Sequence, residues 1–163
     1  MKKREAFTLV ELIIVIAIIA ILAGAIFVAI DPARRLHETR NARRSSDIAT
    51  VLDAVKKYQA DNEGAHFDEI ASMTNAVYYG IGTDAELCSG CSVVSGITEC
   101  VDLSDMGNNY LAVIPTDPLD GTEENTQYYI VKDAEGTITV GSCSAEGEGP
   151  GGAGDAAEMY ITR

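Results

Sequence analysis

The feature that most constrains this chain is an uninterrupted apolar run over residues 12–30, which contains no charged side chain. As an α-helix this run is roughly 28 Å long, close to the hydrocarbon thickness of a bilayer. A helix satisfies its own backbone hydrogen bonds, so an all-round apolar surface is stable in lipid. The basic start, Met1-Lys2-Lys3-Arg4, favours a cytoplasmic N-terminus and export of the remainder. We therefore expect a signal anchor rather than a uniformly soluble globule.

The charges are segregated along the chain. The 163 residues include 12 basic and 25 acidic side chains, a net charge of −13. Residues 31–57 carry seven basic and four acidic side chains, whereas residues 58–163 carry two basic and nineteen acidic ones. An acidic body of this kind is repelled by nucleic acid phosphates, so we expect no direct nucleic acid partner.

The residues before the apolar run carry a second signal. Glu11 stands at the start of the run, where a carboxylate costs several kcal/mol unless it is neutralised or paired. An ordinary secretory signal would have a shorter apolar core and a small-residue cleavage site after it. Here Ala23-Gly24-Ala25 lies inside the run. These features argue against a signal that is simply removed.

The same residues resemble the class III signal of type IV pilins and type II secretion pseudopilins, in the order Lys2-Lys3-Arg4-Glu5-Ala6-Phe7-Thr8-Leu9-Val10-Glu11-Leu12-Ile13. The resemblance implies that a prepilin peptidase cleaves between Ala6 and Phe7 and then N-methylates Phe7. The family usually has Gly before the cut, where this chain has Ala6. Residues 1–6 would then be the leader.

The resemblance suggests a role for Glu11 in assembly. Cleavage creates a cationic amine on Phe7 at nearly the same membrane depth as Glu11. In a filament, Glu11 of one subunit can pair with the Phe7 amine of a neighbour, so that two costly charges become one compensated pair. The alternative is that Glu11 lies at the headgroup level without a specific role.

The helix is expected to continue past the apolar run. Asp31-Pro32 interrupts it, because proline lacks a backbone donor and clashes with the preceding turn. Beyond it, apolar residues recur at helical spacing and form one face of the helix: Ile48, Val51, Leu52, Val55 and Tyr58. The residues after Asp61 predict the end of this helix. We predict a membrane or filament-core helix over 7–30 and an amphipathic continuation over 31–62.

The remainder, 63–163, is predicted to be a β-rich exported domain, giving an α+β fold in which a small antiparallel sheet covers the helix face. Candidate strands are 76–81, 109–114, 127–132 and 136–142, with a hairpin turn over 133–136. Pro115-Thr116-Asp117-Pro118 followed by Tyr128-Tyr129 is similar to a pilin pattern and implies the pilin fold. Residues 147–154 indicate a flexible linker or surface loop, and 156–163 stay unplaced between an edge strand and a loose tail.

The basic cluster just beyond the apolar run has three interpretations. It can contact anionic lipid headgroups, pair with acids of neighbouring subunits, or form a solvated helix face. A role in DNA binding is opposed by the acidic body. The cluster comprises Arg34, Arg35, Arg40, Arg43 and Arg44.

The cysteines are Cys88, Cys91, Cys100 and Cys143. Export favours disulfides, and four cysteines allow three pairings. The alternative, a zinc site at the Cys88/Cys91 pair, lacks a second close ligand pair.

A calcium site is a further possibility, since oxygen-rich loops are what calcium prefers and similar pseudopilins hold calcium in a comparable region. Its candidate ligands are Asp117, Asp120 and Glu123, with Glu124 beside them. An EF-hand pattern is absent, and acid-rich loops are usually only solvated. No other cofactor is expected.

Catalysis is not expected. His37 and His66 are the only histidines and neither has a nucleophile at a recognisable spacing, while the glycine-rich stretch lacks the lysine of a phosphate-binding loop.

The resemblance implies a structural subunit of a type IV pilus, a helical homopolymer that supports adhesion, motility or DNA uptake. Its expected partners are the prepilin peptidase, the pilus assembly platform, minor pilins and, before assembly, membrane lipid. It would lie first in the cytoplasmic membrane and then in an extracellular filament. The alternatives are a type II secretion pseudopilin and a monomeric signal-anchored exported domain that binds a ligand.

Overall fold

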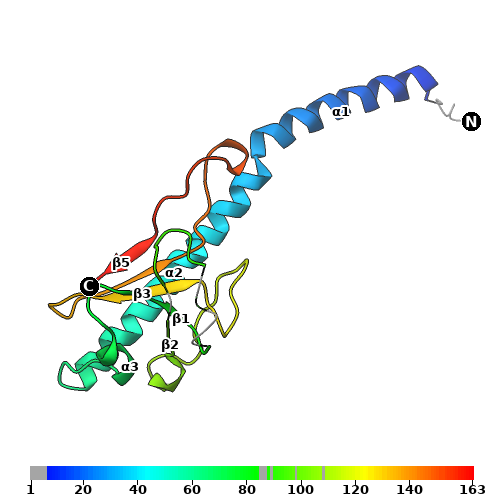
Figure 1. Ribbon diagram of the computed structural model, residues 1–163. Coiled ribbons are helices and arrows are strands. Elements are labelled where there is room, and N and C mark those ends of the chain that lie inside the picture. The colour runs from blue at the N-terminus through cyan, green and yellow to red at the C-terminus, as the bar shows by residue number, and fades with distance from the viewer. Residues whose placement is uncertain (1–6, 85–87, 89, 98, 108) are drawn as a thin grey trace, which may run out of the picture.

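A long helical arm leads into a small domain at its far end (Figure 1). The computed structural model describes residues 7–84, 88, 90–97, 99–107 and 109–163. Helix α1 spans Leu9–Ile30 and helix α2 spans Pro32–Asp61. The arm extends away from the domain, and only α2 runs along it.

The two helices meet at Asp31, whose backbone adopts the left-handed conformation (φ 47°, ψ 72°). Pro32 occupies the first position of α2, where its missing N–H costs nothing. The predicted interruption at Asp31-Pro32 is therefore a one-residue break between two regular helices.

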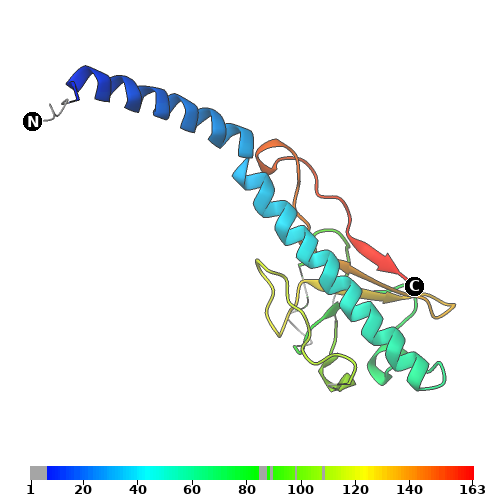
Figure 2. The same ribbon diagram turned by 180° about the vertical axis from the view of Figure 1, so that it is seen from behind.

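The apolar face predicted for α2 is the helical half of the core. Four of its predicted members are 1% exposed: Ile48, Val51, Leu52 and Val55. Tyr58 packs at the edge of the same cluster. Figure 2 shows the molecule from behind, with α2 lying over one face of the sheet. The 3.6-residue periodicity thus identifies the buried stripe correctly.

The sheet has five strands in the order β2-β1-β3-β4-β5. In chain order, they are β1 Tyr78–Ile81, β2 Cys100–Val101, β3 Tyr128–Lys132, β4 Ile138–Ser142 and β5 Tyr160–Thr162. Three pairs are antiparallel, as expected, and the short strand β2 adds a parallel pair with β1 at one edge. A short helix α3, Asp68–Ser72, and two 3-10 turns, η1 Ser104–Met106 and η2 Pro150–Gly152, complete the elements. The α+β class is confirmed.

One face of the sheet closes the core against α2. Ile130 in β3 and Ile138 and Val140 in β4 are fully buried there. Because side chains alternate along a strand, the residues between them lie on the opposite, outer face. The β3–β4 hairpin turns at Gly136, whose φ of 82° requires glycine, as the sequence indicated.

The predicted strand over 109–114 is wrong. The backbone N–H groups of Tyr110 and Leu111 both donate to the carbonyl of Gly107, which makes turns rather than a ladder. Leu111 is buried but Val113 is 78% exposed, so the apolar run does not reflect sheet packing. The unplaced tail, by contrast, forms edge strand β5, and Arg163 exchanges both backbone hydrogen bonds with Ile138.

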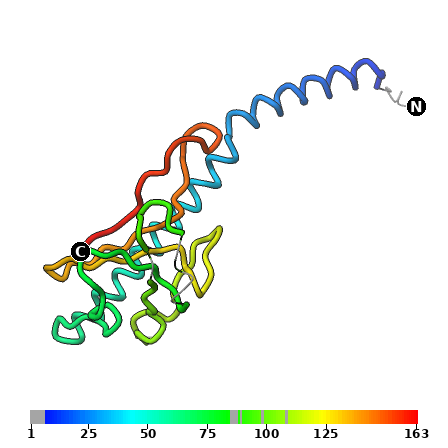
Figure 3. The backbone as a smooth tube through the Cα atoms, in the orientation of Figure 1, coloured from blue at the N-terminus to red at the C-terminus, as the bar shows by residue number. Residues whose placement is uncertain are grey.

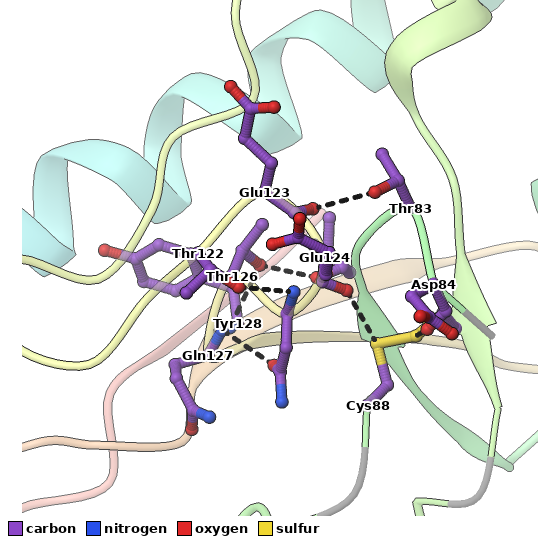
Figure 4. Close-up of a disulfide and its surroundings, with 12 residues drawn as sticks. Thr83, Asp84, Cys88, Thr122, Glu123, Glu124, Thr126, Gln127 and Tyr128 are labelled. Atoms are coloured by element: carbon purple, nitrogen blue, oxygen red, sulfur yellow. Dashed lines mark hydrogen bonds between the residues drawn. A yellow bond between two sulfur atoms is a disulfide. The ribbon is translucent and has the colours of Figure 1, made fainter. Parts of the chain in front are cut away.

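Two disulfides hold the segment before β2. Cys88 joins Cys100, and Cys91 joins Cys143 directly after β4. The structure thus selects one of the three possible pairings. Figure 4 shows Cys88 beside the loop of Glu123 and Glu124, where Thr83 Oγ1 donates to the Glu123 carbonyl (3.3 Å). Cys88 is thus tied to strand β2, and Cys91 is tied to the residue that follows strand β4.

Replacing both Cys91 and Cys143 by Ser is expected to destabilise the domain more than replacing both Cys88 and Cys100. The bridges span 52 and 12 residues, and loop entropy gives roughly 4 and 3 kcal/mol respectively. Urea unfolding of the two double variants and the parent, followed by near-ultraviolet circular dichroism, measures the difference. A larger loss for the Cys88/Cys100 variant would contradict the chain-entropy argument.

Candidate functional site

The start of α1 holds Glu11 in a capping box with Thr8. The Thr8 N–H and hydroxyl both donate to Glu11 Oε2, at 2.9 and 2.7 Å, and the Glu11 N–H donates to Thr8 Oγ1 at 3.2 Å. The helix N-terminus also favours negative charge there. The carboxylate is therefore held one turn from Phe7, which is 84% exposed. Ala6, on the other side of the predicted cleavage, lies outside the described residues.

Helix α1 buries none of its residues. Its large apolar side chains point outward on every side, with Leu9 and Ile21 more than 70% exposed. The arm contains a helix long and apolar enough to cross a membrane. An apolar surface of this size is stable only against lipid or against other apolar helices.

Asp31 ties the break between the helices to the domain. Its Oδ1 caps α2 by accepting from the Arg34 N–H (3.4 Å), and its Oδ2 accepts from the Gly151 N–H (2.6 Å). The hydrogen bond from Gly151 is the main reason that the pKa of Asp31 lies below its usual value. Figure 3 shows the glycine-rich segment, in orange to red, beside the beginning of α2. The segment thus forms a surface loop seated on the helix.

The predicted basic cluster divides into two groups. Arg34 and Arg35 are solvent-facing and pair with Glu38, and Arg43 lies 3.7 Å from Asp47. Such exposed pairs contribute little to stability. The other two members, Arg40 and Arg44, turn toward the domain, a role that the three sequence interpretations did not include.

Arg44 and Asp117 form a fully buried ion pair. Arg44 Nε and Nη2 donate to the two Asp117 carboxylate oxygens at 2.6 and 3.1 Å, and both side chains are 0% exposed. The remaining Arg44 nitrogen donates to Asn41 Oδ1 (2.9 Å) and to Glu146 Oε2 (2.7 Å). Asp117 accepts in addition from the Leu119 N–H at 2.9 Å. This bidentate geometry joins three distant segments around one guanidinium.

Glu146 extends the pair toward the membrane side of α2. It accepts from Arg40 and Arg44, and the Asn41 amide donates to its backbone carbonyl (2.7 Å). The hydrogen bond from Arg40, followed by that from Arg44, lowers the pKa of Glu146 from 4.5 to about 2. We call these residues the arginine lock: Arg40, Arg44, Asp117 and Glu146.

The sequence held a signal for this lock. Arg44 lies four residues before Ile48, on the same helical face as the core residues, where an exposed arginine is not expected. A basic residue on an apolar stripe needs a buried acid, and the Pro-x-Asp-Pro pattern supplies Asp117. Glu146 carries no comparable signal, because its partner choice depends on where the tail runs.

The structure does not gather the calcium candidates. The Asp117 carboxylate is taken up by Arg44. Within the described residues, no group of three or more acidic, histidine or cysteine side chains could hold a metal ion. Figure 4 shows the Glu123 side chain pointing away from the neighbouring disulfide. Calcium binding stays an untested prediction.

Both histidines have packing partners. His37 Nδ1 lies 2.7 Å from the Gly147 carbonyl oxygen, and its Nε2 is 3.4 Å from Glu146 Oε1. His66 Nδ1 lies 2.8 Å from the Gln59 amide nitrogen. Burial, followed by the charges of Lys132 and Lys56, lowers the pKa of His66. These contacts place the two rings in structural roles.

Residues 1–27 match the family described as the prokaryotic N-terminal methylation motif. The chain carries the class III signal of type IV pilins and pseudopilins. No curated protein and no solved structure matches the chain. The motif is a structural signal rather than an enzyme family, and it implies processing by a prepilin peptidase. With the uncovered α1, it fits a membrane-anchored precursor of an exported protein.

Replacing Arg44 by Met is expected to cost about 3–5 kcal/mol of unfolding free energy, because it leaves Asp117 buried without its counter-charge. The matched control is Arg43→Met at the preceding position of α2, where the side chain is 63% exposed. That change should stay within about 0.5 kcal/mol of the parent. Urea unfolding in nonionic detergent measures both; equal losses would refute the lock.

The depressed pKa of Glu146 predicts acid sensitivity. A carboxylate whose pKa falls on folding adds stability that is complete above pH 4.5 and is lost as the pH falls toward 2. Glu146→Gln should therefore be less stable than the parent at pH 7, by about 3 kcal/mol, with a difference that shrinks below pH 4.5. Unfolding curves between pH 7 and pH 2 test this. The exposed Asp105→Asn is the control, and a constant difference across the range would contradict the assignment.

Proposed function

We propose that the chain is the structural subunit of a type IV pilus, stored in the cytoplasmic membrane and assembled into an extracellular filament. The observation that carries the proposal is helix α1, which buries none of its residues and lies mostly within the methylation motif at residues 1–27. Once subunits leave the bilayer, the apolar surface needs another cover. Bundling the α1 helices of many copies supplies it, with the acidic domains on the outside.

Glu11 is proposed to select the register of the bundle. In a single chain its carboxylate is satisfied by Thr8. Cleavage before Phe7 creates a cationic amine on Phe7, about one turn from Glu11. The Glu11 carboxylate of a neighbouring subunit can then pair with this amine. An amine and a carboxylate that enter an apolar core as a pair avoid the cost of two isolated charges.

The proposal includes the partners that processing and assembly need. These are the prepilin peptidase, the assembly platform and minor pilins, with membrane lipid covering α1 beforehand. Filaments of this kind serve adhesion, motility or DNA uptake. Because the domain is strongly acidic, we propose no direct contact with nucleic acid. A type II secretion pseudopilin would use the same arm, and the location of the filament separates the two.

Glu11→Ala is expected to abolish incorporation into filaments while leaving the precursor in the membrane. The control is Glu38→Ala, which removes an acid of α2 outside the apolar segment; among the described residues, Glu38 forms its ion pairs with Arg34 and Arg35. Electron microscopy and immunoblots of sheared surface fractions give the readout. Filaments of normal abundance from Glu11→Ala would refute the pairing mechanism. A parent chain absent from sheared filaments would favour the pseudopilin or the monomeric anchored domain.

A further inference from the structure

The outer face of the sheet, turned away from α2, carries three tyrosines from three strands. Tyr129 of β3 pairs in register with Gly141 of β4, and Gly141 pairs with Tyr160 of β5. In the neighbouring row, Tyr78 of β1 pairs with Val131 of β3. The strand register therefore brings the three rings around one spot on the sheet.

The three tyrosines line a hollow of about 330 Å³, together with valine and threonine side chains of the same face. The Tyr78 and Tyr129 rings meet edge to face, with centroids 5.5 Å apart. Gly141 makes room, since a Cβ there would lie 2.3 Å from Tyr129 Cζ. Tyr160 is 55% exposed and Tyr78 37%, so these rings remain open to solvent. Val94 of the disulfide-bonded segment also lines the space.

The hollow has the electrostatics of a cation site. Its lining contains one carboxylate, Glu158, and no basic side chain. Aromatic faces add the negative part of their quadrupoles. Burial, then Tyr78 and Glu158, raises the pKa of Tyr129 to about 12, so its hydroxyl stays neutral at pH 7. We call this site the tyrosine hollow, defined by Tyr78, Tyr129, Glu158 and Tyr160.

We propose that the tyrosine hollow binds a small organic cation of the quaternary ammonium class, free in solution. Aromatic cages with a nearby carboxylate recognise such cations through cation–π attraction. A divalent metal would require several oxygen ligands, whereas the hollow offers a single carboxylate. A neutral apolar ligand would leave Glu158 without a role. The site lies on the outer face of the sheet, across from α2.

The test is calorimetric titration of the full chain in nonionic detergent with choline chloride, against sodium chloride at equal ionic strength. We expect saturable binding with a dissociation constant of roughly millimolar order. The neutral isostere 3,3-dimethyl-1-butanol should bind about tenfold more weakly, since it has the shape but not the charge. Equal binding of the isostere would overturn the proposal, as would no binding of choline beyond that of sodium.

Variants locate the binding. Tyr160→Leu should weaken choline binding by roughly threefold to thirtyfold, and Tyr160→Phe should retain it because the ring remains. Glu158→Gln should also weaken it, while Asp105→Asn, which removes an exposed acid elsewhere, should not. Near-ultraviolet circular dichroism verifies that each variant is folded. Unchanged affinity in both Tyr160→Leu and Glu158→Gln would refute the site.

A lipid headgroup presents the same cation with a phosphate attached. Glycerophosphocholine therefore serves as a competitor that carries the headgroup without a membrane. The acidic domain should repel its phosphate, so we expect it to bind more weakly than choline. Tighter binding of glycerophosphocholine would assign the hollow to a headgroup and overturn the free-cation proposal.

Discussion

The buried ion pair between Arg44 and Asp117 is the constraint on which the domain depends. Both side chains are excluded from water, so each charge needs the other and the further hydrogen bonds around it. Those bonds bring the loop of Asp117 and the segment of Glu146 to the same turn of α2. Apolar packing alone would tolerate small shifts of the sheet along the helix. A bidentate ion pair does not tolerate such shifts. The arginine lock therefore fixes the position of the sheet along α2.

The two helices of the arm, α1 and α2, share the same regular geometry but differ in their surroundings. Helix α1 has no buried residue, whereas α2 contributes Ile48, Val51 and Leu52 to a dry core. The boundary is Asp31, whose carboxylate caps α2 and accepts from Gly151 of the glycine-rich loop. The domain is complete without α1. In the proposed assembly, the apolar surface of α1 passes from lipid to other helices while the core of the domain stays unchanged.

Local patterns predicted much of this fold, and tertiary contacts account for what they missed. The helical face of α2, the β3–β4 hairpin and the break at Pro32 follow from periodicity and turn chemistry, which act over a few residues. Strand β2 has only two residues and pairs in parallel with β1, so it leaves no periodic pattern. The strand expected over 109–114 failed because its apolar residues face different environments. In the lock, sequence patterns mark Arg44 and Asp117, but no spacing reveals that Glu146 joins them from the other end of the domain.

The two faces of the sheet have different neighbours. The inner face is covered by α2. This helix is joined directly to α1, which carries most of the methylation motif. The outer face is shaped by a different device, the Cys91–Cys143 bridge, which holds Val93 and Val94 beside Tyr129. Substitutions on the outer face leave the lock and the arm untouched. In terms of the two proposals, this division separates the surface that binds a cation from the helices that assemble.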